Sequence, residues 1–151
     1  MFSITAYNNQ YLRLEQNTMQ VVLSISVDAS ANIPPAPLAL GIALDHSGSM
    51  DGRKIDAALN GAARVVQTLD ETMTFMLVSF NHEARILFGP AQGTPENKRR
   101  ALQAIQSVYA NGGTRMSTAL NAIVDKFGQK RDWAAKILFL TDGKNEGEQR
   151  Y

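Results

Sequence analysis

The sequence predicts an α/β fold in which a doubly wound, mostly parallel sheet carries an antiparallel hairpin at one edge. Short apolar runs alternate with amphipathic segments of helical period over residues 38–140, and this alternation is typical of a parallel sheet covered on both faces. Two of the apolar runs are separated by only three residues, which is too short for a parallel crossover and favours a hairpin. The length of 151 residues suits one such domain.

The N-terminal part is expected to be a short strand-rich segment. Residues 19–27, MQVVLSISV, are rich in β-branched side chains, and residues 11–15 alternate apolar with polar. Three prolines follow within DASANIPPAP, residues 28–37, and favour an extended chain. We therefore predict a strand-rich segment over residues 1–31, a Pro-rich linker over 32–37, and the α/β domain over 38–151.

The first half of the α/β domain holds three predicted strands and one helix. The apolar run that begins at residue 38 predicts a buried strand ending at Asp45. Residues 53–69 carry apolar side chains at helical spacing. Residues 74–80 and 84–88 are the two strands of the predicted hairpin at the sheet edge.

Two helices and one strand are predicted in the second half. Residues 94–108 indicate a helix that begins at Thr94 as N-cap, with Pro95 in its first position. Another helix follows Thr114 and stops at Gly128. Its apolar positions, which we expect to be buried, are Leu120, Ile123, Val124 and Phe127. Residues 135–140 predict the last strand.

Composition excludes several kinds of partner and site. A net charge of +1 produces no long-range field that would attract nucleic acid or an anionic membrane. The absence of cysteine excludes disulfides and thiolate zinc sites. No apolar run approaches the ~18 residues of a membrane span, and the first residues show no signal-peptide pattern. We expect a cytoplasmic protein that binds neither nucleic acid nor membrane.

Oxygen-bearing side chains follow the strand that ends at Asp45. Ser47 and Ser49 come at alternate positions after it, with Gly48 between them. Asp142 ends the last predicted strand, and the carboxyl ends of parallel strands share one rim of the sheet. Carboxylates and hydroxyls are oxygen ligands of low total charge, which suit a hard cation such as Mg²⁺.

Three motifs occur in a recognisable order: Asp-x-Ser-x-Ser at residues 45–49, Gly-Gly-Thr at 112–114 and Thr-Asp-Gly at 141–143. Together they resemble the complete metal-ion-dependent adhesion site of von Willebrand factor A (VWA) domains, in particular of prokaryotic-type VWA proteins. The resemblance covers about residues 37–143 and implies the Rossmann-like fold of that family.

The resemblance also implies a metal site and a function. Ser47 and Ser49 would bind Mg²⁺ directly, Thr114 directly or through water, and Asp45 and Asp142 largely through water. Mn²⁺ and Ca²⁺ accept similar oxygens. An acidic side chain of a protein partner would fill the remaining position, so we expect a metal-dependent protein-interaction module without catalytic activity.

Other interpretations of these residues stay open at the level of sequence. Each aspartate could be a turn former or helix cap, and we expect Asp51 to cap the first helix. The same carboxylates could serve a Mg²⁺-dependent hydrolase or phosphoryl-transfer enzyme, with His46 or Asp51 as base, although no P-loop pattern occurs. The domain could also be structural, with an empty site. His82 is expected in a solvated turn, and Trp133 in packing.

The end of the chain departs from the family pattern. Relatives continue for two more strands and at least one helix, whereas this chain stops nine residues after Asp142 with a polar tail. The strand over residues 135–140 is therefore expected to have one open edge. One interpretation is that the sequence is a fragment of a longer protein. The alternatives are that the N-terminal strands, or a second copy in a homo-oligomer, cover this edge.

Overall fold

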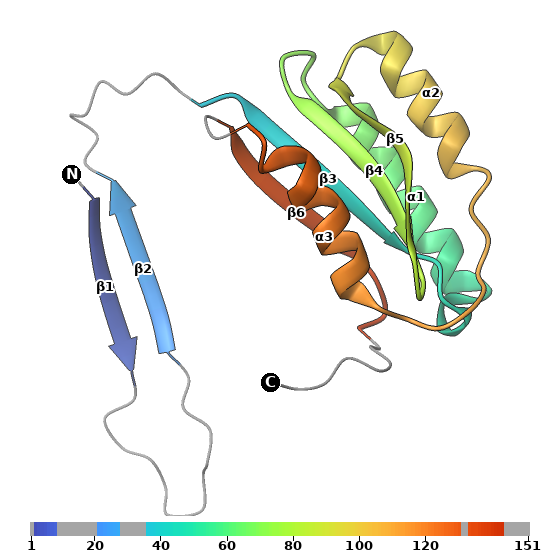
Figure 1. Ribbon diagram of the computed structural model, residues 1–151, viewed down its shortest axis with the longest axis horizontal. Helices are drawn as coiled ribbons and strands as arrows, with labels where there is room; N and C mark the ends of the chain where they lie inside the picture. The colour runs from blue at the N-terminus through green and yellow to red at the C-terminus, as the bar shows by residue number, and fades with distance from the viewer. Residues whose placement is uncertain (1, 9–20, 28–35, 131–132, 144–151) are drawn as a thin grey trace, which may run out of the picture. The chain divides into compact units, whose positions relative to one another are not determined.

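The computed structural model describes residues 2–8, 21–27, 36–130 and 133–143, in two units that comprise residues 1–35 and 36–151 (Figure 1). In the first unit, β1 (Phe2–Asn8) pairs antiparallel with β2 (Val21–Val27). This confirms that the first unit contains strands. The strand expected at residues 11–15 and most of the predicted linker lie outside the described residues.

The second unit contains the predicted α/β sheet. Its strands are ordered β5-β4-β3-β6, with β3 parallel to both β4 and β6, and β4 antiparallel to β5. The parallel sheet and the edge hairpin are therefore confirmed. The elements, in chain order, are β3 (Leu38–Asp45), the 3₁₀ turn η1 (Gly48–Met50), α1 (Arg53–Thr68), β4 (Thr74–Phe80), β5 (Ala84–Gln92), α2 (Pro95–Ile105), α3 (Met116–Phe127) and β6 (Ala134–Leu140).

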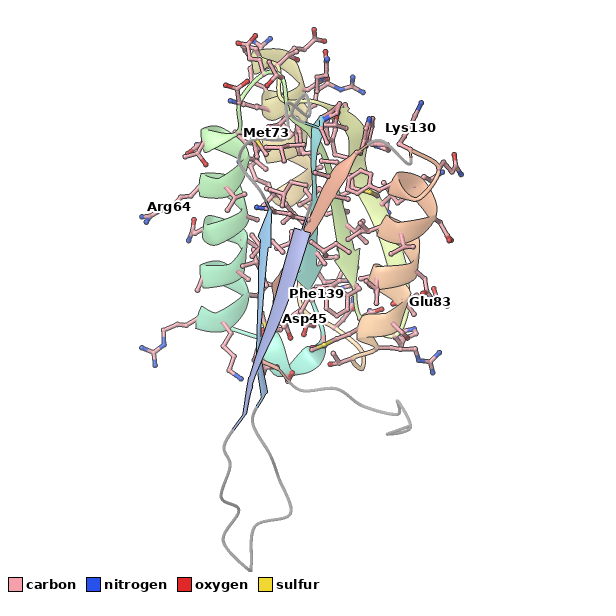
Figure 2. The ribbon with its side chains drawn as sticks, turned by 90° about the vertical axis from the view of Figure 1, so that its left-hand side faces the viewer. Asp45, Arg64, Met73, Glu83, Lys130 and Phe139 are labelled. Carbon is pink, nitrogen blue, oxygen red and sulfur yellow. The ribbon has the colours of Figure 1, made fainter. Side chains whose placement is uncertain are left out.

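Helices cover both faces of this sheet, with α1 and α3 on opposite sides (Figure 2). Because side chains alternate along a strand, Ile42 and Leu44 of β3 pack in the core under α1 and α2, whereas Ala43 packs under α3. A strand buried on both faces needs a continuous apolar run, which residues 38–44 supply. No helix in the described parts of the chain is long and apolar enough to cross a membrane.

The burial expected for α3 is wrong at two positions. Ile123 and Phe127 are buried with Ala119, at spacings of four residues, against the sheet. Leu120 and Val124 are 42% and 50% exposed. Each lies one residue beyond a buried position, and one residue turns a helix by about 100°, so these two side chains point away from the contact.

The ends of β5 and α2 also differ from the predicted ends. The strand predicted at residues 84–88 continues through Gly89 and Pro90 to Gln92. A proline is tolerated there because β5 is an edge strand, and the register of β5 against β4 shifts between Phe75 and Val78. The helix predicted over residues 94–108 ends at Ile105, while its N-cap is confirmed: Asn97 N–H donates to Thr94 Oγ1 at 3.3 Å.

The order of the strands places two distant loops at one rim. From β3 the chain crosses to β4 on one side, and it later returns to form β6 on the other side of β3. Leu44 and Leu140 are register partners, so the residues after β3 and after β6 leave the sheet together. Ligands of open α/β sheets bind at such a point of reversal. Within the described strands of the second unit, β6 pairs with β3 alone.

The close contact between β3 and α3 generates a stability prediction. A Cβ atom on Gly41 would lie 2.6 Å from Ile123 Cγ2. We expect Gly41→Ala to lower the free energy of unfolding by about 1–3 kcal/mol, measured by urea denaturation, because the added methyl overpacks a buried contact. Gly61→Ala is the matched control: its nearest atom, Leu140 Cδ1, would lie 4.0 Å away, and alanine favours a helix interior.

Ile123→Ala should relieve the overpacking in the double variant. The new methyl at position 41 would fill part of the space that the isoleucine vacates. The double variant should therefore lose less unfolding free energy than the two single variants lose together. Strictly additive losses, or a loss in Gly61→Ala equal to that in Gly41→Ala, would contradict this account of the contact.

Candidate functional site

The side chain of Asp45 is the innermost acid of the rim and is 0% exposed. Its Oδ1 accepts from the Ser47 N–H at 2.9 Å, as aspartates commonly do from the residue two positions on. Its Oδ2 accepts from the Thr141 hydroxyl at 2.6 Å, directly after β6. Because a buried carboxylate is costly unless hydrogen-bonded, these bonds hold the loops after β3 and β6 together.

The loop after β3 brings two hydroxyls side by side. Ser47 is buried, and its carbonyl accepts from Met50 N–H at 2.9 Å, which closes the 3₁₀ turn. The hydroxyl oxygens of Ser47 and Ser49 are 3.2 Å apart. Gly48 N–H donates to the Gly112 carbonyl at 2.8 Å, and a Cβ on Gly48 would lie 3.2 Å from that same oxygen. The glycine therefore permits the close approach of the two loops.

The loop that carries Thr114 is anchored by backbone hydrogen bonds. Besides the Gly48–Gly112 contact, Asn111 N–H donates to the His46 carbonyl at 2.7 Å, and Arg115 N–H donates to the Asn81 carbonyl at 2.7 Å. Gly112 adopts a φ of 72°, which side-chain-bearing residues rarely adopt. Thr114 itself is buried within this anchored segment, just before α3.

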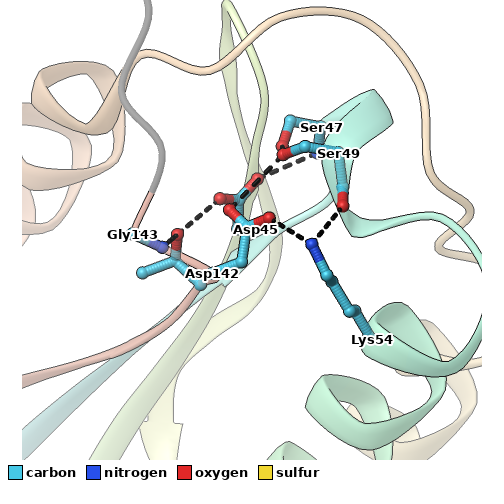
Figure 3. A network of polar contacts seen from close by, with 7 residues as sticks. Asp45, Ser47, Ser49, Lys54, Asp142 and Gly143 are labelled. Atoms are coloured by element: carbon cyan, nitrogen blue, oxygen red, sulfur yellow. Dashed lines mark hydrogen bonds and ion pairs between the residues drawn. The ribbon is translucent and has the colours of Figure 1, made fainter.

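Asp142 follows β6 and faces both α1 and the loop of Ser47 and Ser49, called the serine loop below (Figure 3). Its Oδ1 accepts from the Ser49 hydroxyl at 3.4 Å, and its Oδ2 forms an ion pair with Lys54 Nζ at 2.7 Å. The Lys54 ammonium also donates to the Ser49 carbonyl at 3.0 Å. One lysine from the first turn of α1 thus joins the two loops.

The structure brings four of the five predicted site residues into one hydrogen-bonded cluster: Asp45, Ser47, Ser49 and Asp142. It places the loop of the fifth, Thr114, against the serine loop through Gly112. Oxygens at right angles in an octahedral Mg²⁺ shell lie about 2.9 Å apart. The Ser47–Ser49 and Ser49–Asp142 separations of 3.2 and 3.4 Å are near that value, so this donor set could hold a small hard cation with slight adjustment.

Three other residues shape the rim without having been assigned a role from sequence: Lys54, Thr141 and Asn81. Asn81 Nδ2 donates to Asn111 Oδ1 at 2.8 Å, and its Oδ1 accepts from Glu83 N–H at 3.0 Å, so it ties the hairpin turn to the Thr114 loop. A signal existed for Lys54, because a cation in the first turn of a helix opposes the helix dipole unless an anion lies nearby.

The remaining expectations have mixed outcomes. His82 is exposed in the turn between β4 and β5, and Trp133 packs on Phe127 with ring centroids 5.9 Å apart, both as expected. The expectation that Asp51 caps α1 is wrong, because Gly52 occupies the N-cap position and Asp51 ends the 3₁₀ turn.

His46 lies beside Asp45 and is the nearest imidazole to the serine loop. Burial lowers the pKa of His46, and a hydrogen bond with the Tyr109 backbone and the charge of Asp45 oppose this shift. Its Nδ1 is buried and meets no hydrogen-bond partner within the described residues. The Ser47 hydroxyl lies 3.2 Å from the Ser49 hydroxyl.

The buried Asp45–Thr141 bond generates a second stability prediction. Thr141→Val keeps the shape of the side chain but leaves a buried carboxylate oxygen without this donor, so we expect a loss of about 1–3 kcal/mol in unfolding free energy in metal-free buffer. Thr68→Val is the control, since the exposed Thr68 hydroxyl donates to Val65 O at 2.9 Å on the surface of α1. Equal, small losses of unfolding free energy in both variants would show that the Asp45–Thr141 bond contributes little to stability.

Comparison with known proteins places this architecture in a family. The model of the von Willebrand factor type A domain matches residues 40–145. An uncharacterized protein of Synechocystis sp. is 32% identical over 142 residues, covering 92% of this chain and 33% of that protein. Inter alpha-trypsin inhibitor heavy chain 4 of Mus musculus is 29% identical over 123 residues, covering 76% of this chain and 13% of its own length. The chain thus spans a third or less of these relatives.

Solved structures share the fold. A von Willebrand factor type A protein from Catenulispora acidiphila superposes with a TM-score of 0.72 at 24% identity, over 98% of this chain and 35% of that one. The vWF domain of the type V pili tip protein Mfa5 from Porphyromonas gingivalis gives 0.65 at 20% identity, over 75% of this chain and 40% of that one. With the family model matched over most of its α/β unit, this chain belongs to the von Willebrand factor type A domain family.

Proposed function

We propose that this chain binds one divalent cation, Mg²⁺ by preference, at the rim formed by Asp45, Ser47, Ser49, Thr114 and Asp142, and that it binds a protein partner through that cation. The observation that carries the proposal is the position of the Ser49 hydroxyl, which lies 3.2 Å from the Ser47 hydroxyl and 3.4 Å from Asp142 Oδ1, an acid 93 residues further along the chain. VWA domains generally mediate protein–protein interaction.

The surroundings of each side chain support a division of roles. Both oxygens of Asp45 are engaged by Ser47 N–H and Thr141, which favours contact with a cation through water. The Ser47 and Ser49 hydroxyls are neutral donors on a loop held by its own turn, so they add ligands without adding charge. Two carboxylates balance the charge of a dication, and a bound Mg²⁺ would supply an electrophilic position for one outside oxygen.

A partner carboxylate is the group best suited to that position. It is a hard anionic oxygen donor, and the rim is otherwise built from oxygen side chains with no thiol in the sequence. We propose interaction rather than catalysis, because a hydrolase or phosphoryl-transfer site needs a positioned base or nucleophile. The only imidazole next to the serine loop, His46, is partly buried and its Nδ1 has no partner in the described region.

Metal binding is tested by titrating Mg²⁺ into metal-stripped protein by calorimetry. We expect one site in the wild type and none measurable in Asp45→Ala, because the innermost acid of the rim is lost. The same variant should lose the metal-dependent gain in stability, which grows as RT ln(1 + [Mg²⁺]/Kd) and reaches about 2.7 kcal/mol at one hundred times Kd. Asp125→Ala, an exposed acid on α3, is the control and should bind like the wild type. Equal affinity in Asp45→Ala would refute the assignment.

Partner binding is tested with the immobilised chain and lysate of the source cell, in Mg²⁺ and in chelator. We expect at least one protein to be retained only in Mg²⁺, and to be lost with Asp45→Ala but not with Asp125→Ala. A set of retained proteins that is identical with and without chelator would argue against metal-dependent interaction.

A further inference from the structure

Lys54 makes a contact that the proposed site does not require. Its ammonium lies 2.7 Å from Asp142 Oδ2 and 3.0 Å from the Ser49 carbonyl (Figure 3). The lysine side chain is 52% exposed, whereas that of Asp142 is 12% exposed. The ion pair therefore sits at the boundary between the rim and solvent, with its cation on the outer side.

The position of this lysine in its helix needs an explanation. Lys54 is in the first turn of α1, where the helix dipole disfavours a cation. The next residue, Ile55, is buried in the core and orients the turn. Asp56 in the same turn and the anionic rim both offset the unfavourable position. At the rim, Asp45 and Asp142 contribute two negative charges, and the ammonium neutralises one of them.

We infer that Lys54 is a built-in competitor of the metal, a tethered cation that holds Asp142 and the serine loop when no dication is bound and lowers the affinity of the rim for one. The inference rests on the proposed function, because it concerns the same site. With the ammonium in place, a dication would raise the formal charge of the two acids and the lysine from −1 to +1; with the ammonium withdrawn, the acids and dication would balance.

The geometry allows this exchange. Lysine carries its charge on a flexible four-carbon stem, and the half-exposed side chain of Lys54 can move its ammonium into solvent without opening the core. Two cations on one carboxylate repel each other, strongly at the short distances of this rim. The contact therefore sets the metal concentration at which the rim becomes occupied, and it keeps the serine loop and Asp142 in place below that concentration.

The test compares wild type with Lys54→Met, which keeps the stem and removes the charge, by calorimetric titration with Mg²⁺ alone. We expect Lys54→Met to bind Mg²⁺ about threefold to tenfold more tightly, because the half-exposed ion pair that the metal must displace is partly screened by solvent. Lys126→Met, an exposed lysine in the last turn of α3, loses the same charge away from the rim and should change affinity less than about twofold. The difference between the two lysine variants should shrink at high salt, as screening weakens repulsion.

Lys54→Gln provides the same comparison if the methionine variant does not fold. Thermal unfolding without metal checks that each variant is folded. Tighter binding in the uncharged variants, or binding in them alone, supports the inference. If the wild type binds Mg²⁺ and the uncharged variants bind equally or more weakly, the competitor role is overturned while the metal site stands. If neither wild type nor variants bind, the proposed function fails, and this inference fails with it.

Discussion

The burial of one carboxylate organises the rim of this domain. Asp45 is the last residue of β3, a central strand of the sheet, and its side chain is 0% exposed. A charge in such a place is tolerated only where hydrogen bonds replace the lost water. The donors come from the loop after β3 and from the residue after β6, so satisfying Asp45 requires two distant segments to adopt one arrangement.

The neighbouring loops extend this constraint through backbone contacts. Gly48 donates to Gly112, Asn111 donates to His46, and Asn81 accepts from Arg115. These bonds join three connections of the sheet: those after β3, after β4 and before α3. A site assembled on the ends of a rigid sheet holds its groups more precisely than one on a free loop. The proposed interaction thus depends on a rim whose oxygens are placed before any partner arrives.

Local sequence patterns were sufficient for most of the elements, whereas the set of candidate ligands came from the family resemblance and stays a prediction. The three-residue gap at residues 81–83 required an antiparallel hairpin, and the Thr94–Pro95 pair marked the start of α2 through a local cap. Periodicity was insufficient for α3, where Leu120 and Val124 match the helical spacing of buried residues but lie outside the contact with the sheet. Which apolar stripe is covered depends on the neighbouring strands and cannot be read from the helix alone.

The amino-acid sequence by itself determined that two strand-end acids share a rim, because parallel strands present their carboxyl ends together. It also placed a glycine between the two serines, where the loop can fold tightly, whereas the approach of Gly48 to the Gly112 carbonyl was decided by the tertiary structure. Only the tertiary structure decided that Thr141 satisfies Asp45, that Asn81 anchors the Thr114 loop, and that Lys54 pairs with Asp142. These contacts join residues 30 to 96 positions apart. Such partners are selected by the packing of the sheet and helices, which no local pattern encodes.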